Sequence, residues 1–141
     1  MSTEQNKTNF KRLYDEVFNQ GNLDVADELI GENVIEHQQQ PGVSPEAAGP
    51  ELVKQIAQFF RSAFPDLHIA IDDLIAEEDR VVARVTITGT HQGEMMGIPP
   101  TGKHVEFGSI DIIRFEDGKA TEHWGETDTM KMMQQLGVIP A

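Results

Sequence analysis

The chain has 141 residues, 38% of them apolar, a composition that suits one soluble domain with a single core. Its 24 acidic and 11 basic side chains give a net charge of -13, which argues against nucleic acid and anionic membrane surfaces as partners because both need a basic face. The absence of cysteine excludes disulfides, thiolate metal sites and a thiol nucleophile, so any chemistry must come from His, Asp, Glu or Tyr.

The first part of the chain predicts two helices. Apolar side chains recur there with the spacing of one helical face: Phe10, Leu13, Tyr14, Val17 and Phe18. Gly21 ends this helix, and Asn22 caps a short second helix that runs to Gly31. A brief strand is predicted over 34–37.

A polar loop over 38–49 leads to a third predicted helix. Pro50 fits the first turn of that helix, where its missing N–H is not needed, and Pro65 stops it. Phe60 belongs to the apolar face of this helix, which we expect to point inward.

Beyond the third helix, the apolar period changes from helical to alternating. Alternation over 67–71 and 81–87 predicts two strands joined by a turn at Asp79-Arg80. Two further strands, 105–115 and 119–128, form a predicted hairpin, and a short closing helix follows.

The segment from His91 to Lys103 has the composition of a specialised loop. Its glycines and prolines disfavour regular helix or strand. The flexible side chains of Met95 and Met96 are of a kind that lines adaptable apolar sites. We interpret it as a lid with His91 at its hinge; a packed loop with buried methionines is the alternative. A phosphate-binding loop is rejected, because His104 stands where Ser or Thr is required and begins a predicted strand.

Helices followed by a meander of strands predict an α+β fold. We expect residues 1–141 to form one cone-shaped domain, in which a strongly curved antiparallel sheet and three or four helices close an apolar pocket. No apolar run reaches the roughly 20 residues of a membrane span, and the polar start lacks the apolar core of a signal peptide, so a cytoplasmic location is expected.

The turn of the last hairpin decides which residues face each other. A two-residue turn would place Asp111 opposite Trp124, whereas a three-residue loop with a bulge at Gly118 places Asp111 opposite His123, and we favour the second. One face then carries Phe107, Ser109, Asp111, Ile113, Phe115, Thr121, His123, Gly125 and Thr127. Ile110, Ile112, Glu122 and Trp124 lie on the other face, which predicts a homodimer interface.

A carboxylate opposite an imidazole in an apolar pocket is a candidate acid-base pair, with Asp111 fixing the tautomer of His123 and raising its basicity. A structural cross-strand pair is the alternative. His91 is a further catalytic candidate. Candidates for substrate binding are Tyr14, His37, Phe60, Met95, Met96, Phe107, Ser109 and Asp128, several of which also suit core packing or polar positions near a loop. The histidines have no metal-ligand spacing, so we expect no metal.

These motifs resemble the SnoaL-like polyketide cyclases of the nuclear-transport-factor-like superfamily. The resemblance rests on the His91–Lys103 loop, the Ile110–Lys119 hairpin, Glu122-His-Trp124 and Gln134–Gly137, and it covers nearly the whole chain. It implies the cone fold, a homo-oligomer and a cofactor-free intramolecular aldol closure of a polyketide ester, in which a side chain removes a proton next to a carbonyl.

The chain departs from that family at one position. The acid-base aspartate implied by the resemblance stands two residues after the strand histidine, where this chain has Gly125, although His91 matches the loop histidine. Either Asp111 and His123 do the acid-base work with Glu126 or Asp128 assisting, or the protein is related without that reaction. Three functions therefore stay open: a cofactor-free lyase or isomerase acting on a carbonyl compound, a hydrolase that activates water, and a noncatalytic carrier of small apolar molecules.

Overall fold

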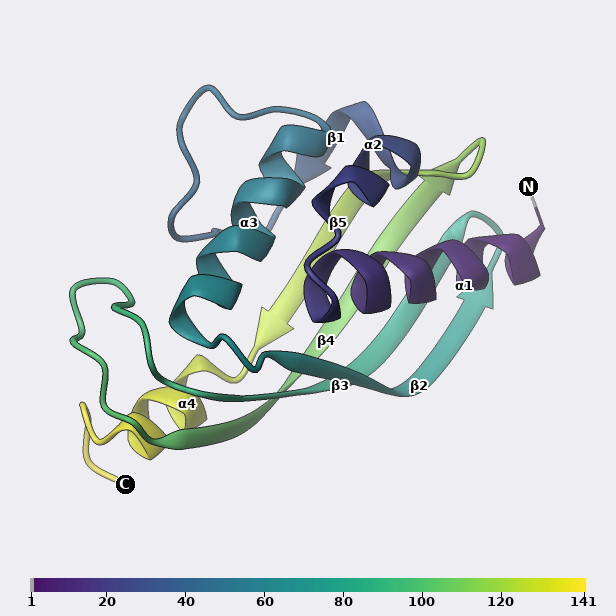
Figure 1. Ribbon diagram of the computed structural model, residues 1–141. Coiled ribbons are helices and arrows are strands. Elements are labelled where there is room, and N and C mark those ends of the chain that lie inside the picture. Colours follow the sequence, from purple (N-terminus) through teal and green to yellow (C-terminus); the bar gives the residue numbers. More distant parts are fainter. Residues whose placement is uncertain (1) are drawn as a thin grey trace.

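The computed structural model describes residues 2–141, which form an α+β domain with helices against one curved sheet (Figure 1). Its helical elements are α1 (Thr3–Arg12), a π-helical segment (Leu13–Asn19), a 3-10 turn (Leu23–Val25), α2 (Ala26–Leu29), α3 (Pro50–Ala63) and α4 (Thr129–Leu136). Its strands are β1 (Ile30–Glu36), β2 (His68–Glu77), β3 (Arg80–Thr90), β4 (His104–Glu116) and β5 (Lys119–Thr127). The predicted α+β class is confirmed.

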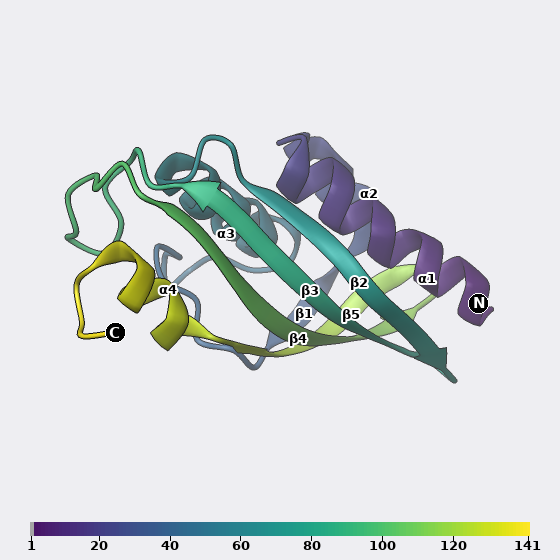
Figure 2. The same ribbon diagram turned by 90° about the horizontal axis from the view of Figure 1, so that it is seen from below.

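The five strands lie in the order β1-β5-β4-β3-β2. Strands β2 to β5 form the predicted antiparallel meander, but β1 pairs with β5 in parallel, so the prediction of a wholly antiparallel sheet is wrong. Strand alternation carries no information about direction, and β1 reaches β5 only through a long-range pairing. The sheet twists strongly and curves beneath the helices without closing into a barrel (Figure 2).

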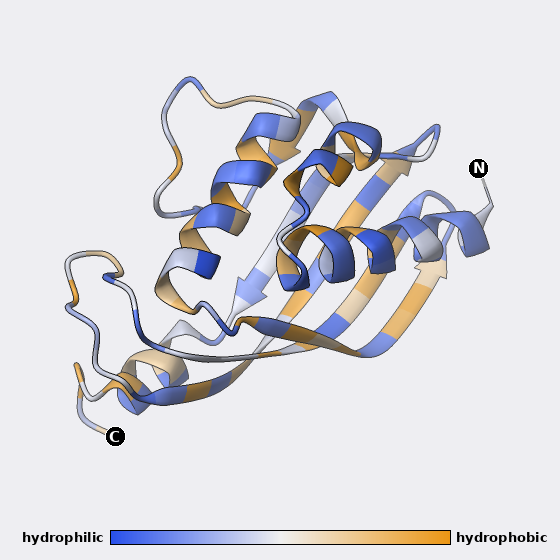
Figure 3. Cartoon of the chain, viewed as in Figure 1, coloured by the Kyte–Doolittle hydropathy of each residue, from blue (hydrophilic) through white to orange (hydrophobic). Residues whose placement is uncertain are grey.

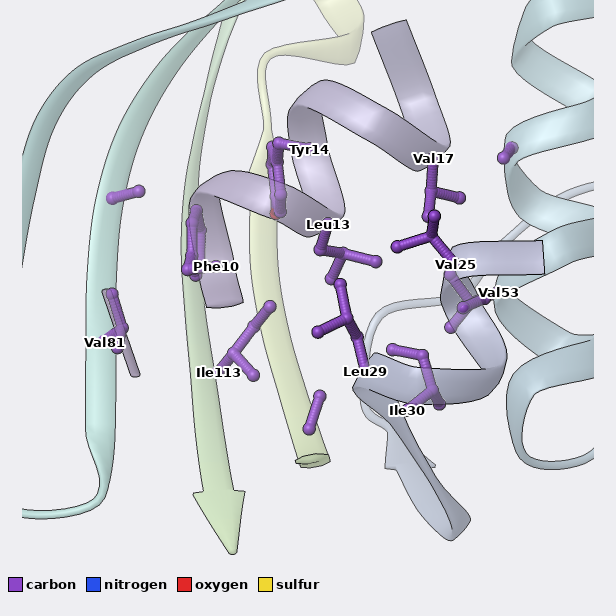
Figure 4. Packing of buried hydrophobic residues seen from close by; sticks show 14 of the residues in the cluster. Phe10, Leu13, Tyr14, Val17, Val25, Leu29, Ile30, Val53, Val81 and Ile113 are labelled. Atoms are coloured by element: carbon purple, nitrogen blue, oxygen red, sulfur yellow. The ribbon is translucent and has the colours of Figure 1, made fainter. Parts of the chain in front are cut away.

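Helices α1, α2 and α3 cover one face of the sheet, and α4 packs beside the beginning of β4 (Figures 1 and 2). The strands carry alternating polar and apolar bands, and α3 is apolar on one side only (Figure 3). The main core lies between these layers, where Phe10, Leu13 and Val17 pack with residues of α2 and the sheet (Figure 4). Burial of these apolar faces is therefore what holds the helices over the sheet.

The predicted first helix is present, but it changes character after Arg12. From Leu13 to Asn19 it is π-helical, a wider form that is rare and often found at functional sites. Tyr14 lies in this segment and stacks on Phe10 with ring centroids 4.4 Å apart. The predicted second helix is shorter than expected, since β1 already begins at Ile30.

The loop from 91 to 103 is closed at its base by backbone hydrogen bonds between His91 and the far end of the segment. His91 N donates to Lys103 O at 2.9 Å, and Gly102 N donates to His91 O at 2.8 Å. At its tip, Met95 and Ile98 exchange two backbone hydrogen bonds around a turn with positive φ at both central residues. Strand β4 begins at His104, so no helix follows the Gly-Lys pair, in agreement with the rejection of a phosphate loop.

The register of the β4–β5 hairpin differs from the prediction. The turn is the two-residue Asp117-Gly118, with φ of 50° and 80°, and the extra residue is Thr121 within β5. Asp111 consequently lies opposite Gly125, and His123 lies opposite Ile113. Relative to the favoured prediction this is a shift of two residues, which keeps every side chain beyond the bulge on its expected face.

Two smaller corrections concern the turns. Thr121, predicted on the pocket face, is the bulged residue and has no cross-strand partner, and Ala120 is buried opposite Phe115 instead. The β2–β3 turn is formed by Glu78 and Asp79, one residue earlier than predicted, and Arg80 already belongs to β3.

Candidate active site

A cavity of about 400 Å³ lies between the helices and the inner face of the sheet, a size typical of small-molecule sites. Its wall is mainly apolar, and it contains no Lys or Arg among the residues that the structure describes. Eight of the residues predicted from the sequence line it: Tyr14, Phe60, Met95, Met96, Phe107, Ser109, Asp111 and His123. The structure therefore brings most of the candidate site together.

Two of the predicted substrate-binding residues lie elsewhere. His37 is on the outer side of the sheet, where its ring stacks on Trp124 and its Nε2 lies 2.6 Å from Glu122 Oε2. Asp128 caps α4, since its carboxylate accepts a hydrogen bond from Lys131 N. Glu126 faces outward opposite Ile110, so neither carboxylate suggested as an assistant reaches the cavity.

His91 is also outside the cavity wall, although it was a catalytic candidate. Its side chain is fully buried against Phe64, and its Nδ1 accepts a hydrogen bond from Thr101 N at 3.2 Å. Accepting this bond makes Nδ1 the unprotonated nitrogen of the ring. The structure thus places His91 at the base of the lid, where it holds the two ends of the loop together.

The polar end of the cavity is built on a histidine held between two carboxylates. His123 Nδ1 lies 2.6 Å from Glu36 Oε1, and His123 Nε2 lies 3.1 Å from Asp111 Oδ1. The three side chains come from β5, β1 and β4, and each is at most 15% exposed. Asp111 reaches His123 diagonally, because the residue directly opposite it is Gly125.

This arrangement keeps His123 protonated. Burial alone would lower the pKa of His123, but the hydrogen bonds and negative charges of Asp111 and Glu36 outweigh it and raise the pKa to about 9. At neutral pH both ring nitrogens are therefore donors, and His123 cannot accept a proton. The predicted contact between Asp111 and His123 is present, although the two residues are not directly opposite each other, and the group that can accept a proton is a carboxylate, not the imidazole.

The raised pKa of His123 makes the folding stability depend on pH. The folded value of about 9 lies above the ordinary 6.5, so the imidazolium contributes stability that is complete below about pH 6.5 and is lost as the pH rises through about 9. We expect the free energy of unfolding to fall by roughly 2 to 3 kcal/mol between about pH 6 and pH 10. Urea melts at fixed protein concentration measure this, and the loss should be absent in a His123→Gln variant.

Asp111 presents its two oxygens differently. Oδ1 receives hydrogen bonds from Ser109 Oγ at 3.3 Å and from His123, neither of which reaches Oδ2, and the Tyr14 phenol is a further hydrogen-bonding partner of the carboxylate. The Tyr14 hydroxyl is close by: burial, followed by the charge of Asp111, raises the pKa of Tyr14 well above its usual value, so the phenol stays a neutral donor. The cavity thus combines a carboxylate with the positive charge of the adjacent imidazolium and with a neutral phenol donor.

Glu36 is the main functional residue that the sequence analysis missed. A signal was available in the alternation of this strand. Val34, Glu36 and Gln38 are two residues apart, so their side chains lie on the same face, and the apolar Val34 indicates that this face points inward. The contact of Glu36 with His123, 87 positions away in the chain, follows from the parallel β1–β5 pairing, which the sequence does not show.

Comparison with known proteins agrees with this architecture. Residues 8–136 match the SnoaL-like polyketide cyclase family. The chain belongs to this family. Among curated SnoaL-like proteins, it is 30% identical to the aklanonic acid methyl ester cyclase DnrD of Streptomyces peucetius, over 86% of this chain and 84% of that protein.

Solved SnoaL-like structures show the same fold. TsrD from Streptomyces laurentii superimposes with a TM-score of 0.87 at 28% identity, covering 99% of both chains. AclR from Streptomyces galilaeus, described as a putative hydroxylase, superimposes with a TM-score of 0.83 at 31% identity, covering 99% of this chain and 85% of that one. The fold is therefore shared by proteins with different described activities.

Two features are absent from residues 2–141. No group of three or more His, Cys, Asp or Glu side chains that could hold a metal ion occurs in this part of the chain. Nor does any helix there have the length and apolar character needed to cross a membrane.

Proposed function

We propose that this SnoaL-like protein is a cyclase that closes a ring by intramolecular aldol addition in a neutral polyketide ester, with Asp111 as the general base. The observation that carries the proposal is the Glu36-His123-Asp111 cluster at the polar end of an apolar cavity. A charged imidazolium beside a carboxylate, one oxygen of which is left free by His123 and Ser109, is suited to moving a proton at carbon.

In the proposed reaction, Asp111 Oδ2 removes a proton from the carbon next to a carbonyl, leaving an enolate. The imidazolium of His123 and the hydroxyl of Tyr14 are positioned to stabilise the negative charge that develops on oxygen. The enolate carbon then attacks a second carbonyl of the same molecule, and the new alkoxide takes back the proton from Asp111. Protons and electrons balance, so the reaction needs no oxidant or reductant.

The charge of the site supports a substrate without a free acid group. Two carboxylates face one imidazolium at the polar end, and no Lys or Arg among the described residues lines the cavity to neutralise a carboxylate on the ligand. Burying such a group unpaired would be costly. A methyl ester of the kind named for DnrD would avoid this cost while keeping the carbonyl that activates the neighbouring C–H.

The test is incubation with aklanonic acid methyl ester, followed by liquid chromatography and mass spectrometry. A cyclase gives a product of unchanged mass and new retention time. An ester hydrolase gives the lighter free acid, whereas a carrier returns the substrate intact and only raises the melting temperature of the protein. Either of these two results overturns the proposal.

We also propose that the protein forms a homodimer through the outer face of the sheet. Apolar side chains from all five strands lie on this face: Ile35, Ile75, Val82, Ile110, Ile112 and Trp124. Ile35, Ile75 and Ile110 are each more than 40% exposed in the single chain, which is unusual for a cluster of large aliphatic residues. A second copy placed about a twofold axis would cover the patch with the same patch.

Ile110→Lys is expected to break this dimer, because a twofold interface would then bury two added charges. We expect the dissociation constant to rise by roughly 30-fold or more. Light scattering at micromolar concentration is the measurement, and Asn22→Lys, which adds the same charge on the helical side, is the control. A wild-type protein with the mass of one chain contradicts the proposal.

A further inference from the structure

A chain of hydrogen bonds links Gln38 to the proposed base. Gln38 Nε2 donates to Thr127 Oγ1 at 2.8 Å, Thr127 Oγ1 lies 3.1 Å from Ser109 Oγ, and Ser109 Oγ donates to Asp111 Oδ1 at 3.3 Å. Because the Gln38 amide nitrogen can only donate, the Thr127 hydroxyl is free to donate onward to Ser109. Gln38 therefore favours the arrangement in which the Thr127 and Ser109 hydroxyl protons point toward the carboxylate, in competition with Glu126 O, which also lies 3.3 Å from Ser109 Oγ.

The same residue closes the chain into a ring. Gln38 N donates to Glu36 Oε1 at 3.0 Å, and this oxygen also contacts His123 Nδ1. Both carboxylates that flank the imidazolium are thus tied to Gln38, one through its backbone and the other through its side chain. The amide carbonyl is held in turn by Gln40 Nε2 at 3.2 Å.

Gly125 lies inside this ring and explains why the side chains converge. A Cβ atom at this position would lie 2.4 Å from Gln38 Oε1 and 2.6 Å from Asp111 Oδ1, closer than such contacts allow. The absence of a side chain at residue 125 is therefore what gives the Gln38 amide and the Asp111 carboxylate their places.

Gln38 also stands where β1 passes into the loop over residues 37–49, which precedes α3 (Figure 1). Residues 38–41 of this loop line the cavity, as does Met96 at the tip of the lid. A displacement of this loop would withdraw Gln38 from Thr127 and release Ser109. The orientation of Asp111 is consequently linked to the position of a surface loop.

We propose that Gln38 is a positioning residue, which holds Asp111 in its reactive orientation when the 37–49 loop lies over the cavity. That this orientation of Asp111 is the reactive one rests on the proposed function. The hydrogen-bond chain itself is present without substrate. Gln38 contacts no reacting atom in this scheme and acts through Thr127 and Ser109.

The test uses the two imidazolium N–H protons of His123, which are donated to Asp111 and to Glu36. In ¹⁵N-histidine-labelled protein near pH 7, the Nε2 proton should exchange slowly with water while Asp111 is held in place. We expect Gln38→Met, which keeps the length of the side chain but cannot donate, to speed this exchange by about tenfold or more. Thr127→Val should do the same, and the double variant should add little, because both substitutions break one chain.

Gln58→Met is the matched control, because Gln58 is exposed on α3, does not line the cavity, and its side chain forms no hydrogen bond to the described residues. The proposal is overturned if Gln38→Met leaves exchange of the Nε2 proton unchanged, or if Gln58→Met speeds that exchange equally. If Gln38→Met does not fold, Thr127→Val provides the same test. Cyclisation assays add a second readout, in which kcat should fall more than KM rises. Because the exchange measurement needs no substrate, its result is independent of whether the protein proves to be a cyclase.

Discussion

Asp111→Asn is expected to slow cyclisation by roughly two to four orders of magnitude while leaving the fold intact. The asparagine amide keeps the shape of the carboxylate, and its oxygen can still accept the hydrogen bonds from Ser109 and His123. It cannot take up a proton from carbon, so the step assigned to Asp111 is lost. Initial rates with aklanonic acid methyl ester and melting temperatures of both proteins measure the two effects separately.

Asp73→Asn is the control for the change of charge. Asp73 is exposed on β2 and pairs with Arg84 on the outer side of the sheet, far from the described site. Its rate should match that of the wild-type protein. An Asp111→Asn variant that keeps the full rate would show that the carboxylate has only a structural role, and the base would have to be sought elsewhere.

The second large effect is expected at Gly125. Gly125→Asp would place a new side chain where Gln38 Oε1 and Asp111 Oδ1 already lie, and would add a third carboxylate beside His123. Overpacking and the unpaired charge together should lower the free energy of unfolding by about 2 to 5 kcal/mol near pH 7. The introduced group is destabilised as a carboxylate, so the loss should shrink as the pH falls and the group gains a proton.

Two alanine variants separate these causes in denaturant melts between about pH 4 and 8. Gly125→Ala carries only the steric cost, about 1 to 3 kcal/mol, and its cost should depend little on pH. Gly108→Ala in β4 should be tolerated, because the nearest atom to its Cβ would be Val85 O at an ordinary 3.6 Å. If Gly125→Asp were as stable as the wild-type protein at every pH, residue 125 would not face the cavity, and the β4–β5 register would have to change.

Much of the site was predictable because strand periodicity is a local property. Alternation along β4 and β5 put Asp111, His123 and Gly125 on one face, and this held although the predicted register was wrong by two residues. An even shift moves side chains along a face without turning them over. The composition of the 91–103 loop likewise indicated two methionines at an apolar cavity, which Met95 and Met96 both line.

What the sequence could not decide was pairing between distant segments. The choice between a plain two-residue turn and a bulge changes the partner of Asp111, and the bulge at Thr121 leaves no local signal. The direction of β1 and its place beside β5 decide that Glu36 joins His123, and that the adjacent His37 points to the opposite side of the sheet. These contacts depend on where burial of the helices over the sheet brings the first strand, and only the folded chain fixes that position.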